Sequence, residues 1–184
     1  PRCHLEDVTR ADINGFVLPF VHRLMRLSEQ VPENLRVKVR LCDTMGYGIS
    51  YPGAALPRSI PKLVYKMIHE GGIPSDRLEW HGHNDFHKVH INGATAWLYG
   101  CNAVNTTLLG FGERTGNSPL EGAVFEYIGI KGDTRSMCTT MITRIAEYYR
   151  DVVKAHVQEH YPFVGANFNM TRAGIHADGF SKDE

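Results

Sequence analysis

Extended segments and helical patterns alternate along most of this chain. The first extended piece runs into Glu6-Asp7, and the second, residues 36–41, alternates polar and apolar side chains. The third, residues 78–80, leads into His81, and the fourth covers residues 102–107. Apolar residues at helical spacing follow each of them, in residues 13–27, 59–68, 86–99 and 119–128. Such alternation predicts a parallel sheet whose strands are joined by helical crossovers.

Local signals set the expected limits of these helices. Ser59 suits an N-cap and Pro119 suits a first helical turn, whereas Pro19 predicts a kink inside its helix. Past Gly132 the pattern changes to one long amphipathic helix over residues 141–157, followed by a polar tail. We therefore expect a barrel-type domain over residues 1–131 and a helical linker subdomain over residues 132–184.

The polar residues that stand out follow the strands of the expected sheet. They are Glu6, Thr44, the pair His81 and His83, and Asn117. Parallel α/β proteins place their chemistry at the carboxyl ends of the strands, so this position favours a functional role. Four strand–helix units amount to half of an eight-fold barrel. An isolated half would leave two strand edges open, which is unfavourable for an independent domain.

The composition narrows the class of protein. Twenty basic and twenty acidic residues cancel, which argues against nucleic acid or an anionic membrane as partner. No apolar run approaches the length of a membrane span, and no stretch at the start reads as a signal peptide. The four cysteines are scattered and form no CxxC pair, which predicts reduced thiols and a cytoplasmic location. Ten histidines direct attention to metal or acid–base chemistry.

His81-Gly82-His83 is the most suggestive short motif. Alternate side chains of an extended segment point to the same side, so the two imidazoles can share one metal ion. The alternative is a pair of strand-end histidines that hydrogen-bond to the backbone. A second motif, Gly110 to Asn117, is either a phosphate-binding glycine loop or a tight turn that needs glycine at positive φ. It lacks the Lys-Ser/Thr ending of a P-loop, and its composition favours the turn.

Five motifs together resemble one enzyme family. Their order is Arg2 to Asp7, Cys42 to Gly46, His81 to Asp85, Gly112 to Asn117 and Thr171 to Gly179. This order resembles that of the isopropylmalate synthase, homocitrate synthase and Re-citrate synthase family, which are metal-dependent (β/α)₈ enzymes. The step from His83 to Asn117, 117 − 83 = 34 residues, is similar to the family's interval between strands seven and eight. The resemblance covers essentially the whole chain, and its details look most like the Re-citrate synthase branch.

The resemblance implies a fold, a reaction and a set of residue roles. The fold would be the C-terminal half of the barrel, strands five to eight, with the linker subdomain behind it. The reaction would be a Claisen-type condensation of acetyl-CoA with a 2-oxo acid such as oxaloacetate, 2-oxoglutarate or 2-oxoisovalerate, followed by thioester hydrolysis. His81, His83 and Asn117 would be the metal ligands. Arg2, His4 and Thr44 would bind the substrate, and Glu6 and His176 would be the catalytic residues.

The implied cofactor is one divalent ion, with Zn²⁺, Mn²⁺, Mg²⁺ and Co²⁺ all open. The implied assembly is a homodimer in which His176 acts on the partner subunit's barrel. Family barrels also draw an acidic metal ligand from their first strand, and residues 1–184 begin near the fifth. As an isolated polypeptide, this chain is therefore expected to show no turnover in a steady-state assay of CoA release.

Two other functions stay open from the sequence. One is a metal-dependent retro-aldol lyase of the hydroxymethylglutaryl-CoA lyase type. Lyases of that type tend to carry a cysteine in the loop after strand eight, and residues 110–117 contain none. The other is an inactive fragment whose histidines hold a structural metal, which would show four closed protein ligands.

Overall fold

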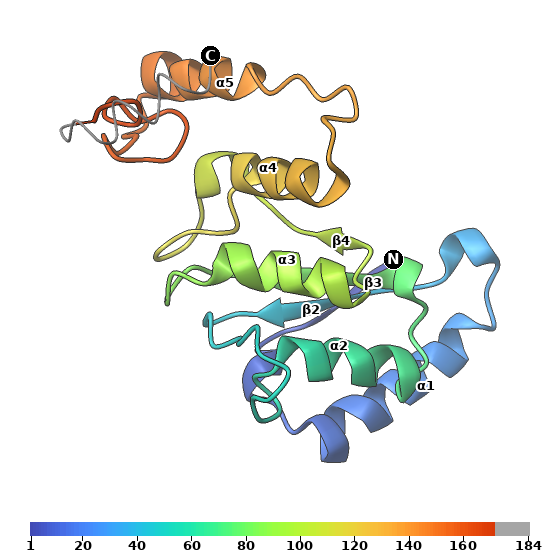
Figure 1. Ribbon diagram of the computed structural model, residues 1–184. Helices are drawn as coiled ribbons and strands as arrows, with labels where there is room; N and C mark the ends of the chain where they lie inside the picture. The colour runs from blue at the N-terminus through green and yellow to red at the C-terminus, as the bar shows by residue number, and fades with distance from the viewer. Residues whose placement is uncertain (172–184) are drawn as a thin grey trace. The chain divides into compact units, whose positions relative to one another are not determined.

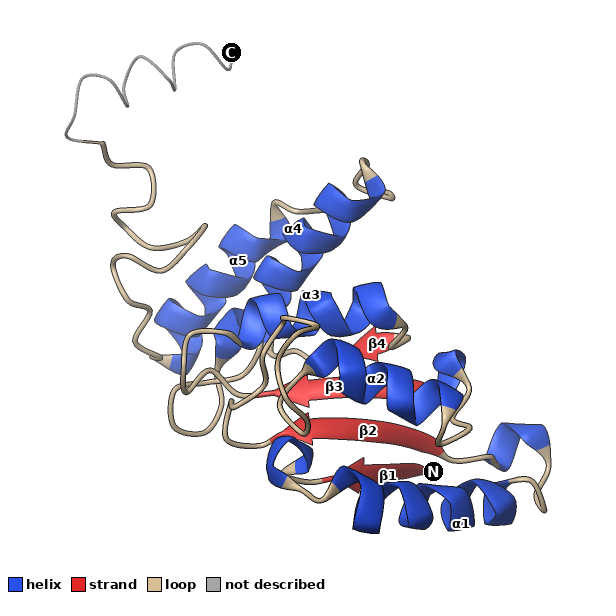
Figure 2. Ribbon diagram, turned by 60° about the horizontal axis from the view of Figure 1, so that its bottom comes forward, coloured by secondary structure: helices blue, strands red, loops and turns tan. Residues whose placement is uncertain are grey.

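Strands and helices alternate in the computed structural model, which describes residues 1–171 (Figure 1). The strands are β1 (Arg2–Leu5), β2 (Lys38–Asp43), β3 (Leu78–Gly82) and β4 (Ala103–Val104). They form one parallel sheet in the order β1-β2-β3-β4, so each strand pairs with its neighbour in sequence (Figure 2). The predicted parallel sheet with helical crossovers is confirmed.

The crossover helices are α1 (Leu18–Ser28), α2 (Ile60–His69) and α3 (Val89–Tyr99), and α4 (Leu120–Lys131) follows β4. Ser59 caps α2 as predicted, because its side chain accepts a hydrogen bond from the amide of Lys62 at 3.4 Å.

Three details differ from the sequence prediction. Residues 13–17 form a π-helical turn, so Pro19 lies in the first turn of α1 and causes no kink inside it. The third helix begins at Val89 instead of residue 86, because His87 adopts a φ of 55° that no helix tolerates. The fourth strand has two residues, where six were expected.

The two faces of the sheet carry different side chains. Val39, Leu41, Leu78 and Trp80 are fully buried on the helix-covered face and pack with α1 and α2 in one core. Because side chains alternate along a strand, the intervening residues face the other way. On that face lie Arg2 and His4 of β1, Arg40 and Cys42 of β2, and Glu79 and His81 of β3.

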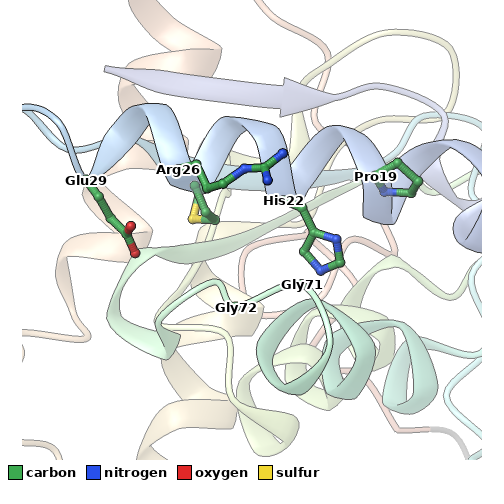
Figure 3. A pocket seen from close by; sticks show the side chains of 7 residues that line it. Pro19, His22, Arg26, Glu29, Gly71 and Gly72 are labelled. Atoms are coloured by element: carbon green, nitrogen blue, oxygen red, sulfur yellow. The ribbon is translucent and has the colours of Figure 1, made fainter.

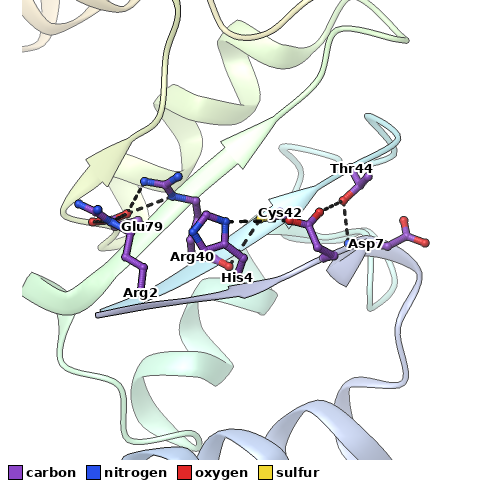
Figure 4. Close-up of polar contacts among 8 residues, drawn as sticks. Arg2, His4, Asp7, Arg40, Cys42, Thr44 and Glu79 are labelled. Carbon is purple, nitrogen blue, oxygen red and sulfur yellow. Dashed lines mark hydrogen bonds and ion pairs between the residues drawn. The ribbon is translucent and has the colours of Figure 1, made fainter. Parts of the chain in front are cut away.

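A buried carboxylate organises this polar face. Glu79 accepts from the Nε of Arg2, which lies 3.1 and 2.8 Å from its two oxygens, and from the Nε and Nη2 of Arg40 at 3.1 and 2.8 Å (Figure 4). Its side chain is 5% exposed, against 16% for Arg40 and 49% for Arg2. Burial opposes the charged form of Glu79, but the hydrogen bonds from the two arginines outweigh it and lower the pKa of the carboxyl. Three strands are thus joined by one charge cluster.

The chain divides into two compact units, residues 1–133 and residues 134–184. The described part of the second unit contains α5 (Met141–Tyr148) and a π-helical turn, Tyr149–Val153. The prediction of one long helix to residue 157 was wrong. Lys154 adopts a φ of 60°, which ends the helix, and Val152 and Val153 are exposed, so no packing extends it. Among residues 1–171, no helix is both long and apolar enough to cross a membrane.

The Glu79 cluster predicts a large difference between two glutamate substitutions. Glu79→Ala should lower the free energy of unfolding by about 3 kcal/mol, because it leaves the largely buried Arg40 without its partner. The matched control is Glu70→Ala, which breaks the exposed i,i+4 pair with Lys66 and should cost about 0.5 kcal/mol or less. Urea unfolding of both variants measures the difference. Equal losses would show that the cluster contributes no more than a surface pair.

Candidate functional site

The loops after β2 and β3 meet at the carboxyl end of the sheet. The buried Asp43 accepts hydrogen bonds from Thr9 Oγ1 at 2.6 Å and from the Gly48 amide at 2.9 Å, which fixes the loop after β2. Burial raises the pKa of Asp43, while these hydrogen bonds act in the opposite direction. Gly46 has a φ of 71°, and a Cβ there would lie 3.0 Å from the carbonyl oxygen of His83. Glycine therefore permits the close approach of the two loops.

His81 and His83 lie together at the end of β3, with ring centroids 4.8 Å apart. His83 Nδ1 is 2.8 Å from the carbonyl oxygen of Thr44. A carbonyl only accepts, so Nδ1 carries the proton and Nε2 presents a lone pair. The Nδ1 of His81 is buried and has no hydrogen-bond partner among the described residues. Burial, and then the neighbouring His83, lower the pKa of His81 and favour the neutral imidazole that binds metals.

Asn117 lies beside this pair. It forms an antiparallel bridge with His83, and its Nδ2 donates a 3.4 Å hydrogen bond to the carbonyl of Phe111. Its Oδ1 is buried and has no partner among residues 1–171. The preceding loop is a tight turn, as its composition favoured: Gly110 and Gly116 have φ values of 65° and 99°. A Cβ on Gly116 would collide with the carbonyl oxygen of Gly110.

The donor atoms that His81, His83 and Asn117 bring to this end of the sheet fit a divalent cation. His81 offers an imidazole nitrogen, His83 its Nε2 and Asn117 an amide oxygen. Nitrogen and oxygen donors of this kind suit first-row divalent ions. The hydrogen bond from His83 to the Thr44 carbonyl is the type of support that orients a ligating histidine. These three residues are the ones that the sequence singled out as metal ligands, and that role remains a prediction.

An ion pair that the sequence reasoning missed holds these loops. Arg114 donates to both carboxylate oxygens of Asp85, at 2.8 and 3.1 Å, and its Nη2 also donates to the carbonyl of Thr44 at 2.5 Å. The hydrogen bond from Arg114 is the main reason that the pKa of Asp85 is lowered. Both residues belong to motifs quoted from the sequence, but only folding shows that they meet.

Glu6, directly after β1, and Thr44, directly after β2, are brought together by the pairing of these strands. Figure 4 shows Thr44 beside Asp7. The hydroxyl of Thr44 donates to Glu6 Oε2 at 2.8 Å and accepts from the Asp7 amide, also at 2.8 Å. His4 Nδ1 lies 4.0 Å from Glu6 Oε1. Cys42, which no sequence argument selected, completes this group: its ligand atom and those of His4 and Glu6 all lie within 4.8 Å of one another. Burial, and then Glu6, raise the pKa of the Cys42 thiol to about 12.

Two of the sequence-predicted site residues stand apart from this arrangement. Arg2 pairs with Glu79 through its Nε, so a substrate carboxylate would have to use its Nη1 and Nη2 groups. Its predicted role in substrate binding stays a prediction. His176, the predicted catalytic residue of the tail, lies outside the described residues.

A separate hollow of about 530 Å³ lies beside α1 (Figure 3). Residues of α1, among them His22 and Arg26, line it together with Gly71 and Gly72, which follow α2. The segment after α2 leads into the amino end of β3, whereas His81 and His83 lie at or beyond its carboxyl end. The hollow therefore belongs to the outer helical layer and contains none of the predicted site residues.

Known proteins are similar to this chain over its whole length or nearly so. Re-citrate synthase of Syntrophus aciditrophicus is 58% identical over 184 residues, which are the whole of this chain and 29% of that protein. Re-citrate synthase of Clostridium kluyveri is 52% identical over the whole chain and 40% of that protein. The 2-phosphinomethylmalate synthase of Streptomyces hygroscopicus is 37% identical over 99% of the chain and 41% of that protein. The chain therefore spans well under half the length of these relatives.

Solved structures show the same architecture. An HMG-CoA lyase of Bacillus subtilis superposes with a TM-score of 0.58 at 17% identity, covering 85% of this chain and 50% of that one. The N-terminal domain of a putative aldolase from Bacteroides vulgatus gives 0.55 at 19% identity, covering 83% and 44%. At such low identity the likeness concerns the fold alone, and the predicted half of a (β/α)₈ barrel is confirmed.

The family model described as HMGL-like matches residues 6–148. The match takes in β2 to β4, the five helices α1 to α5, and the histidine pair. Together with the synthase relatives, it confirms the resemblance that the five sequence motifs indicated. This chain belongs to the HMGL-like family.

Proposed function

We propose that the protein containing this chain condenses an acyl-CoA with a 2-oxo acid and then hydrolyses the thioester. The observation that carries this proposal is the buried His81 Nδ1 and Asn117 Oδ1, without partners among residues 1–171, beside His83, whose Nδ1 is held by the Thr44 carbonyl. The synthase names of the relatives support it. A divalent ion bound there would polarise the keto group of the 2-oxo acid as a Lewis acid.

Glu6 is the proposed base for the methyl group of acetyl-CoA. Thr44 holds one carboxylate oxygen, Oε2, at 2.8 Å, so Oε1 remains to accept a proton. The side chain of Glu6 is 63% exposed, which leaves room for a substrate to approach. Removal of the C–H proton leaves an enolate whose carbon forms the new C–C bond with the keto carbon, and the keto oxygen gains a proton. Water then cleaves the thioester and CoA leaves as the free thiol.

The finer parts of the proposal are the 2-oxo acid and the assembly. The two Re-citrate synthase relatives favour oxaloacetate, with citrate and CoA as products. His176 is proposed as the second acid–base residue, supplied to the partner subunit's site in a homodimer. A retro-aldol lyase is the competing function, and an assay in both directions separates the two.

The first test is a thiol-release assay of the full-length protein with acetyl-CoA. Oxaloacetate, 2-oxoglutarate and 2-oxoisovalerate are compared, each with and without EDTA. CoA release should depend on the 2-oxo acid, be fastest with oxaloacetate and stop when EDTA removes the ion. Cleavage of a 3-hydroxyacyl-CoA without any condensation would instead favour the lyase. No turnover with any of the three acids would contradict the synthase proposal.

The second test separates the histidine pair from other histidines. His81→Ala and His83→Ala should each lower turnover and metal content at least 100-fold, because each removes a ligand from a site with few protein donors. The matched control is His22→Ala on α1, whose Nε2 contacts a backbone carbonyl in the outer layer. Elemental analysis of the purified proteins gives the metal content independently of activity. Full metal content in both site variants would contradict the assignment.

The third test concerns Thr44. Thr44→Val removes the hydroxyl that holds Glu6 and leaves the Asp7 amide without its acceptor, so the free energy of unfolding should fall by about 1–3 kcal/mol. Turnover should fall as well, because Glu6 loses its orientation. Thr44→Ser keeps the hydroxyl and is the matched control. If valine and serine behave alike in urea unfolding and in turnover, the hydroxyl has neither role.

A further inference from the structure

His4, Glu6 and Cys42 form a mixed cluster of metal-binding side chains at the ends of β1 and β2. Their ligand atoms lie within 4.8 Å of one another, and no other group of three His, Cys, Asp or Glu residues in 1–171 comes this close. The cluster contains none of the proposed metal ligands, His81, His83 and Asn117. It is therefore a separate set of donors, although Cys42 pairs in register with His81.

The donor types of the two sets differ in softness. The histidine pair with Asn117 offers nitrogen and amide oxygen only. The cluster adds a sulfur, and thiolate with imidazole and carboxylate suits zinc-like ions more than Mg²⁺ or Mn²⁺. The two sets should therefore prefer different ions, and the sulfur of Cys42 is what distinguishes them.

The cluster is partly arranged for binding already. Cys42 is buried on a strand, with its Sγ 3.8 Å from the carbonyl of Arg40, so its position is fixed. Glu6 is held through Oε2 by Thr44, which leaves Oε1 toward His4 at 4.0 Å. The side chains of His4 and Glu6 are 43% and 63% exposed and can rotate. Small rotations would bring the donors to the roughly 3.5 Å spacing that Zn–N and Zn–S bonds require.

Nearby positive charge is partly offset by carboxylates. Lys38 and Arg40 are the cationic residues on the same strand, four and two residues before Cys42. The guanidinium of Arg40 is paired with the buried Glu79 at 2.8 Å, and Arg2 is paired with the same carboxylate. Glu79 offsets one of these two positive charges within the sheet, and the carboxylate of Glu6 adds a negative charge to the cluster itself.

We propose that His4, Glu6 and Cys42 form a second cation site that takes a thiophilic divalent ion such as Zn²⁺ or Cd²⁺, and that filling it inhibits the enzyme. As the metal–sulfur bond forms, the Cys42 thiol loses its proton to solvent, while His4 and Glu6 contribute lone pairs and nothing is oxidised. Inhibition follows because Glu6 can no longer accept a proton from a substrate. That second part rests on the proposed function, whereas the binding site does not.

The binding test is a Cd²⁺ titration of the metal-free, full-length protein, followed by the ultraviolet charge-transfer band of the cadmium–thiolate bond. The wild-type protein should show the band, and Cys42→Ser should abolish it. Cys138→Ser, at an exposed cysteine far along the chain, is the matched control and should keep it. Glu6→Gln changes an exposed side chain, so folding is not at risk, and it should weaken Cd²⁺ binding at least tenfold. A band that survives in Cys42→Ser would overturn the proposal, as would unchanged affinity in Glu6→Gln.

His81→Ala separates this site from the proposed catalytic one. The variant should keep the cadmium–thiolate band, because His81 is no part of the cluster. Loss of the band would mean that one mixed site exists instead of two. In the activity arm, the Mn²⁺-loaded enzyme should be inhibited by added Zn²⁺, and Cys42→Ser should need at least tenfold more Zn²⁺ for the same inhibition. If no 2-oxo acid is turned over, the proposed function is wrong. The cadmium–thiolate band still shows whether His4, Glu6 and Cys42 bind a metal ion.

Discussion

The register of three parallel strands decides where every polar group of the site can lie. Arg40 lies opposite Glu79 and Cys42 lies opposite His81 on the neighbouring strand. Residues that are paired in this way point their side chains to the same face of the sheet. The helices cover the other face, where Val39, Leu41 and Trp80 are buried. A shift of one residue would exchange the two faces, and burial of those apolar side chains opposes it. The apolar core thereby fixes the polar face.

The same register explains why a charged cluster lies beneath the site. Glu79 lies two residues before His81, and its carboxylate binds the two arginines on this face. The pairing joins three strands and offsets one of the two positive charges near the site. It also occupies Arg2 through its Nε, which is why the residue is less available to a substrate than its motif implied.

Sequence reasoning succeeded where a feature depends on neighbouring residues and failed where it depends on distant ones. The Ser59 cap, the extended segment 78–80 and the position of His81 and His83 on one side of the strand end are local features, and they were predicted. The Arg114–Asp85 pair joins residues 29 apart, and the approach of Cys42 to Glu6 depends on strand pairing. The apolar spacing beyond Tyr149 predicted more helix than forms, because periodicity carries no information about a backbone reversal such as that at Lys154.

Thr44 contacts both the group around Glu6 and the group around His83. Its carbonyl accepts from His83 and Arg114 on the side of the proposed metal ligands, while its hydroxyl holds Glu6 and the Asp7 amide on the other. A side-chain substitution at Thr44 can remove the hydroxyl contacts with Glu6 and Asp7, but it leaves the backbone carbonyl in place for His83 and Arg114. A displacement of the loop after β2 would move both at once. The position of Glu6, the proposed base, and the orientation of His83, the proposed metal ligand, therefore depend on the same short segment, which the buried Asp43 anchors to the sheet.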